Sequence, residues 1–174
     1  SEVEEAERRL KEIAEESKEI SKRSVETNAK ILDEVRRENT RVLETLKKIL
    51  EEVERRVSDE RVVREVEERV KELVRRSEES LRRVEEVIRR VLEENKESMR
   101  RSEERVRRLL EEARKVTDKD ELERLIEDIR EVVERNKKIA DESIKRSRDV
   151  VKRSKETNDE LEKTIREVVK RIED

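Results

Sequence analysis

The sequence predicts an all-α protein: a long, nearly straight, up-down-up three-helix bundle with coiled-coil-like packing. The first observation is compositional, because the 174 residues include no Gly, Pro, Cys, His or aromatic residue, and Gly and Pro supply most tight turns. The second is that a chain with 57% charged and 30% hydrophobic residues places its apolar residues at a helical period along its whole length. The third is that turn signals occur at only two places. Disorder or an isolated helix would not need such a stripe.

The first helix is expected at about residues 2–57. Ser1 followed by Glu4 forms a capping box, in which the hydroxyl accepts from a free backbone N–H of the first turn. Apolar or small inward positions then recur from Val3 to Val57 about every 3.6 residues, which is the period of an α-helix.

The second helix is expected at about residues 60–116. The preceding segment, Val57-Ser58-Asp59, offers two N-cap candidates, Ser58 and Asp59, because short oxygen-bearing side chains can accept from the exposed N–H groups. Its inward positions run from Val63 to Val116 at about 3.5 residues per turn.

The third helix is expected at about residues 120–173. Val116-Thr117-Asp118 repeats the earlier turn pattern, so Thr117 and Asp118 are the cap candidates, with Glu121 completing a capping box. The chain is thus expected to be a single bundle over residues 1–174, with helices of about 57 residues. Their period lies between the values that impose left-handed and right-handed supercoils, which predicts helices that are nearly straight or coil weakly to the left. Such short turns also make successive helices antiparallel.

Polar residues interrupt the stripe at matching heights. Opposed residues of the first two helices should sum to about 117, those of the last two to about 237, and the parallel first and third helices should differ by about 120. These sums bring Asn95 and Ser98 near Ser21 and Ser143, and Ser77 and Ser80 near positions 40 and 157. The predicted buried polar network comprises Ser17, Ser21, Ser24, Asn28, Asn95, Ser98, Ser102, Asn136, Ser143 and Ser147 at one level, and Asn39, Thr40, Ser77, Ser80, Ser154, Thr157 and Asn158 at the other.

The near-identical heptapeptides KRSVETN (22–28) and KRSKETN (152–158) fall at different levels, so they are not expected to face each other. We interpret the polar levels as devices that penalise wrong registers and wrong numbers of helices, because an unmatched buried Asn or Ser costs about 1–3 kcal/mol. The alternative is that these residues lie at the edge of the stripe and face water.

The Gly-free helices, the Val-[Ser/Thr]-Asp turns and the Ser/Thr/Asn core positions resemble those of de novo designed helical bundles with buried hydrogen-bond networks. The resemblance is one of style and covers the whole chain. It implies a molecule made to supply architecture. Some bundles of that class are half of a heterodimer or hold a helix that a partner can replace.

No candidate catalytic, cofactor-binding or metal-binding residues emerge. Nucleophilic catalysis lacks Cys and His, and a Ser activated by Lys would still need an oxyanion site. Transition metals prefer the same two missing residues. A net charge of −3 gives no general attraction to nucleic acid or anionic membranes, and the basic run KRSRDVVKRSK (145–155) lacks aromatic residues for base stacking.

The sequence therefore predicts no enzymatic activity and no cofactor. We expect a structural scaffold whose polar levels set helix register and association. The alternative is a protein-interaction module with an open helical groove, working as half of a heterodimer, as a homo-oligomer subunit or as an acceptor of a partner helix. The expected partner is accordingly none, a designed helix or a copy of the chain, and not nucleic acid, membrane or a small-molecule substrate. Without a signal peptide or spanning segment, we expect a soluble protein from recombinant cytoplasmic expression.

Overall fold

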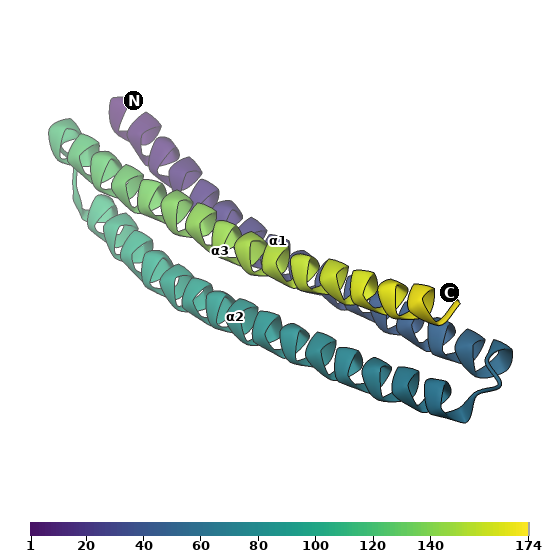
Figure 1. Ribbon diagram of the computed structural model, residues 1–174. Coiled ribbons are helices and arrows are strands. Elements are labelled where there is room, and N and C mark those ends of the chain that lie inside the picture. Colours follow the sequence, from purple (N-terminus) through teal and green to yellow (C-terminus); the bar gives the residue numbers. More distant parts are fainter. Residues whose placement is uncertain (174) are drawn as a thin grey trace. The chain divides into compact units, whose positions relative to one another are not determined.

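The protein is an all-α three-helix bundle in which long helices pack against one another pairwise (Figure 1). The computed structural model describes residues 1–173. Helix α1 spans Glu2–Arg56, α2 spans Glu60–Lys115 and α3 spans Lys119–Glu173. Each boundary lies within one residue of the predicted one.

The first two helices begin at capped N-termini. The backbone N–H of Glu4 donates to Ser1 Oγ over 3.3 Å, which satisfies one of the free N–H groups of the first turn of α1. At α2, the N–H of Arg61 donates to Asp59 Oδ1 over 3.0 Å. The carboxylate of Asp59 also interacts favourably with the positive end of the helix dipole.

The third helix repeats this arrangement, since the N–H of Asp120 donates to Asp118 Oδ1 over 3.1 Å. The prediction of Ser58 and Thr117 as further caps requires a correction. Because α2 begins at Glu60 and α3 at Lys119, each of these two residues precedes the N-cap by one position. The aspartate that follows is the residue next to the free N–H groups.

The chain forms two compact units, and each takes a segment from all three helices. Unit 1 contains Ser1–Ala29 and Arg89–Arg146, whereas unit 2 contains Lys30–Ile88 and the α3 residues from Ser147 onward. The expectation of a single bundle over residues 1–174 extends across both units and stays a prediction.

Unit 1 has its main apolar cluster near the turn between α2 and α3. Leu10 of α1, Leu109 of α2 and Leu122, Ile126 and Ile129 of α3 are buried together there. A fully buried aliphatic side chain contributes about 1.5–3 kcal/mol relative to an exposed one, so this cluster anchors α1 against the α2–α3 hairpin.

Unit 2 is built in the same way near the turn between α1 and α2. Its cluster includes Val42 and Leu46 of α1, Leu73 of α2, and Leu161 and Ile165 of α3, none of them exposed. These inward positions follow the helical period that the sequence predicts.

In the second half of its unit 1 segment, residues 14–29, α1 buries no large apolar side chain. Its successive buried positions are Ala14, Ser17, Ser21, Ser24 and Asn28. No large aliphatic side chain occupies these fully buried positions, so hydrogen bonding has to replace part of the missing apolar contact.

Candidate functional site

Within residues 1–173, polar side chains of the core form three triads, and each triad takes one residue from every helix. In unit 1, the first triad joins Ser17 of α1, Ser102 of α2 and Asn136 of α3. Asn136 Nδ2 donates to Ser17 Oγ over 2.6 Å, and Ser102 Oγ donates to Asn136 Oδ1 over 2.6 Å. One amide thus uses its donor on one neighbouring helix and its acceptor on the other, which matches its two kinds of group.

The second triad, also in unit 1, joins Ser24 of α1, Asn95 of α2 and Ser143 of α3. Asn95 Nδ2 donates to Ser24 Oγ over 2.8 Å and to Ser143 Oγ over 2.9 Å. Asn28 adds to the same group, because its Nδ2 donates to Ser143 Oγ over 3.2 Å and to the Ser24 carbonyl over 3.0 Å.

Ser143 is the most heavily used hydroxyl of this triad. It donates to the carbonyl of Ala140 over 2.8 Å, and it accepts from the amides of both Asn28 and Asn95. A hydroxyl has one donor and two acceptor positions, so these contacts use it fully. The additional approach of Ser24 Oγ to Ser143 Oγ, at 3.2 Å, is therefore the weakest contact in the group.

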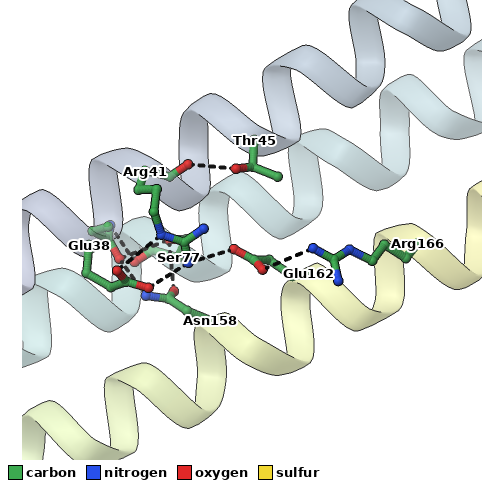
Figure 2. A network of polar contacts seen from close by, with 8 residues as sticks. Glu38, Arg41, Thr45, Ser77, Asn158, Glu162 and Arg166 are labelled. Atoms are coloured by element: carbon green, nitrogen blue, oxygen red, sulfur yellow. Dashed lines mark hydrogen bonds and ion pairs between the residues drawn. The ribbon is translucent and has the colours of Figure 1, made fainter.

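The third triad lies in unit 2 and joins Asn39 of α1, Ser77 of α2 and Asn158 of α3. Ser77 Oγ donates to Asn39 Oδ1 over 3.1 Å, and Asn158 Nδ2 donates to the same oxygen over 3.3 Å. Asn39 Nδ2 in turn donates to the Ser77 carbonyl over 3.4 Å. Figure 2 shows Ser77 and Asn158 among the polar contacts between their helices. These distances are longer than those around Asn136, which indicates weaker individual bonds.

The triads also establish the register between α1 and α3. Three of the hydrogen-bonded pairs that join these helices, Ser17–Asn136, Ser24–Ser143 and Asn39–Asn158, are each separated by 119 residues, and a fourth, Asn28–Ser143, is separated by 115. The predicted offset of about 120 residues, which follows from antiparallel neighbours joined by short turns, is confirmed.

The two repeated heptapeptides lie in different units, in agreement with the sequence. The first places Ser24 and Asn28 in unit 1, whereas the second places Ser154 and Asn158 in unit 2. Their partners also differ, since Ser154 receives a bond from Ser80 over 3.4 Å. The same sequence therefore serves two local environments.

Burial separates the predicted polar residues into three groups. Twelve are buried, and these are Ser17, Ser21, Ser24, Asn28, Asn39, Ser77, Asn95, Asn136, Ser143, Ser147, Ser154 and Asn158. Ser80, Ser98, Ser102 and Thr157 are half-buried, and Thr40 is exposed.

The assignment of Thr40 to the buried network is wrong. Asn39 occupies the inward position, and the next residue on a helix is turned about 100° away from it. Thr40 Oγ1 instead donates to the carbonyl of Arg36 over 2.9 Å. Thr157 behaves in a similar way beside Asn158, since its hydroxyl donates to the Arg153 carbonyl over 3.1 Å. Such bonds to the preceding turn satisfy a hydroxyl without any partner on another helix.

Sequence reasoning missed an ion-pair chain beside the third triad. Arg41 of α1 lies 2.7 Å from Glu38 of the same helix and 3.0 Å from Glu162 of α3, and Glu162 also approaches Arg166 at 3.7 Å (Figure 2). The Glu162 side chain is only 13% exposed. The Oε1 atom of Glu162 is buried. It forms an ion pair with Arg41, but the geometry of this contact is not that of a hydrogen bond. Nothing distinguishes this glutamate in a sequence with 51 acidic residues.

Ion pairs on the surface move the pKa values of several charged groups further from pH 7. The hydrogen bond from Arg41 lowers the pKa of Glu38, and that from Arg100 lowers the pKa of Glu97. The hydrogen bond to Glu16 of α1 raises the pKa of Lys137 of α3. Each of these pKa shifts favours the charged form of its group. A general acid or base, in contrast, works best with a pKa near the operating pH.

The described part of the chain offers neither a metal site nor a membrane span. Within residues 1–173, no three acidic side chains converge in a way that could hold a metal ion. Over the same range, no helix combines the length and the apolar character that a membrane span requires.

No protein-family model, curated protein or solved structure matches the chain.

Proposed function

We propose that the chain is a designed structural scaffold whose buried polar triads set the register and the association of its helices. The observation that carries the proposal is that every triad draws on α1, α2 and α3 at once. A shift of one helix relative to the other two would remove a partner from a buried amide or hydroxyl. Each such loss costs about 1–3 kcal/mol.

The physical need for such a device follows from the apolar clusters. Aliphatic side chains pack without directional bonds, so Val, Ile and Leu at a regular helical spacing accept alternative registers and additional helices. Hydrogen bonds between fixed donors and acceptors form in one register only and so disfavour these alternatives. Their net contribution to stability is small, because water satisfies the same groups in the unfolded chain.

Design as the origin is supported by internal consistency. The helices contain no Gly or Pro, aspartate caps follow both turns, and one heptapeptide appears at two polar levels with a single change. Agreement between local propensity, capping and core pattern at every level is a criterion of design. No catalytic step forms part of the proposal, since the triads place Ser beside Asn and not beside a base.

The test is a variant with Leu at four asparagine positions, Asn39, Asn95, Asn136 and Asn158. We expect an equal or higher melting temperature, because the burial of four Leu side chains at about 1.5–3 kcal/mol each offsets the serine hydroxyls that lose their partners, together with a broader distribution of oligomers. The two measurements are thermal unfolding by circular dichroism and sedimentation velocity over a range of concentrations. Loss of helicity with an unchanged association state would refute the proposed role of the triads.

A matched control changes four apolar core positions and leaves the triads intact. Replacing Leu10, Leu73, Leu109 and Leu161 with Met preserves volume and hydrophobic character. This variant is expected to retain the oligomer distribution of the parent protein. If it broadens to the same extent as the asparagine variant, general core disruption and not triad loss is responsible.

A further inference from the structure

The surface of unit 1 carries a groove between α2 and α3 with an apolar centre. Its volume is about 820 Å³, and its lining includes Ser98, Val132 and Ile139. Ile139 is 39% exposed and is the one large hydrophobic side chain within residues 1–173 with that degree of exposure. The small hydroxyl side chains opposite it on α2 leave it uncovered.

The charges along this groove are divided by sign. The α2 residues at one end are Glu93, Glu94 and Glu97, whereas Arg101 and Arg105 of α2 line the other end. Arg135 of α3 adds to the basic end, because α3 runs antiparallel to α2.

Part of this charge is already paired within the chain. Glu94 lies 2.8 Å from Arg146, and Glu97 lies 3.3 Å from Arg101. Glu93 and Arg105, at the two extremes, form no ion pair within residues 1–173. They are therefore the charges best placed to bind something outside the chain.

The arrangement is complementary to itself. Glu93 and Arg105 lie six residues on either side of Met99, and Glu97 and Arg101 lie two residues on either side of it. The bond between Ser102 and Asn136 brings α3 residue 139 level with α2 residue 99, since the two helices are antiparallel. Ile139 is thus at the height about which the charges change sign.

We propose that a second copy of this chain docks antiparallel across the α2–α3 groove, about a two-fold axis that passes beside Ile139. In such an interface each contact occurs twice. Glu93 of one copy meets Arg105 of the other at both ends, and the two Ile139 side chains cover each other at the centre. Ser102 of the first triad lines the groove, but the proposed contacts between copies are made by Glu93, Arg105 and Ile139, so the inference does not depend on the scaffold proposal.

The expected association is weak and reversible. A single exposed isoleucine with its flanking charges covers much less than the ~800 Å² of total surface that each partner buries in a stable interface, and exposed ion pairs add little individually. Sedimentation equilibrium should show a mass that rises with concentration from 21.1 kDa toward twice that value.

Charge exchange tests the two-fold arrangement directly. Glu93→Arg or Arg105→Glu alone places like charges together at both ends, so each variant should weaken self-association about tenfold or more. An equimolar mixture of the two variants should restore it. In the mixed dimer the introduced arginine faces the introduced glutamate at one end, and the unchanged Arg105 of one chain faces the unchanged Glu93 of the other. The double variant, Glu93→Arg with Arg105→Glu, should also restore association, because both of its contacts again join opposite charges.

The controls are Glu51→Arg and Arg83→Glu, which make the same charge changes at exposed positions outside the groove. Both are expected to associate like the parent, and circular dichroism should show equal helicity for all variants. A parent protein that remains at 21.1 kDa at every concentration overturns the proposal. Self-association that is unaffected by either groove variant, or that the mixture fails to restore, also overturns it.

Discussion

Replacement of Asn136 with Ala tests whether a triad acts as a unit. Asn136 bonds to Ser17 and Ser102 over 2.6 Å each, and a typical hydrogen bond contributes about 1 kcal/mol net. Ser17 is only 4% exposed, so its hydroxyl cannot easily exchange the amide for water. Ser102 is half-buried and can. We therefore expect Asn136→Ala to lower the free energy of unfolding by about 2–3 kcal/mol.

The companion variant removes all three polar groups at once. In Ser17→Ala with Ser102→Ala and Asn136→Leu, no donor or acceptor of the triad remains unmatched, and replacement of both partners of a hydrogen bond by apolar groups can be nearly neutral. Burial of the Leu side chain contributes about 1.5–3 kcal/mol. This variant is accordingly expected to be at least as stable as the parent, although it differs from it at three core positions.

Urea denaturation followed by circular dichroism is the suitable assay. The chain has no Trp or Tyr, which rules out intrinsic fluorescence, and guanidinium would screen the many ion pairs. The temperature is raised until the transition falls within the soluble range of urea. The reasoning is refuted if Asn136→Ala lies within about 0.5 kcal/mol of the parent, the usual range for unremarkable surface substitutions, or if the all-apolar variant is less stable than Asn136→Ala.

Three further substitutions test the core, a cap and an ion pair. Leu46→Ala, in the cluster of unit 2 and 0% exposed, should lower the unfolding free energy by about 2–5 kcal/mol, and a loss below that range in urea titrations would show that the site collapses around the cavity. Asp118→Ala should cost about 1 kcal/mol through the lost N-cap, whereas Thr117→Ala should change thermal stability little; equal losses would contradict the assignment of the cap. The pKa of Glu38 is lowered by Arg41, so the stabilisation is present above the pKa of the unfolded chain and is lost as pH falls through the folded pKa. Because Glu38 is 36% exposed, Glu38→Gln should cost only a few tenths of a kcal/mol at pH 7 and nothing at about pH 2; a loss that is independent of pH would exclude this ion pair as its cause.

Particular residues show why some features were predictable. Helix boundaries depend on local chemistry, and Asp59 and Asp118 stand where the only turn signals occur. The register followed from the turns, because a short connection leaves two antiparallel helices little freedom to slide. An offset of about 120 residues accordingly agrees with the contact between Ser24 of α1 and Ser143 of α3.

Other features could not be read in this way. Asn39 and Thr40 are adjacent and polar. Asn39 lies four residues after Val35 and three before Val42, so the helical period places it inward, and Thr40 is turned about 100° from it. The sequence does not show whether a hydroxyl beside an inward position bonds to another helix or, as Thr40 does, to the preceding turn of its own helix. Glu162 is one carboxylate among many, and only the approach of Arg41 from α1 distinguishes it.

The sequence by itself determined that this chain forms three long helices, where they begin, and at which heights their polar residues meet. These properties depend on backbone propensity, caps and periodicity, which are local along the chain. Only the tertiary structure divided the polar residues into three triads and left Ile139 uncovered between opposite charges. Both features depend on how side chains from different helices pack against one another. The sequence of a single helix does not specify that packing.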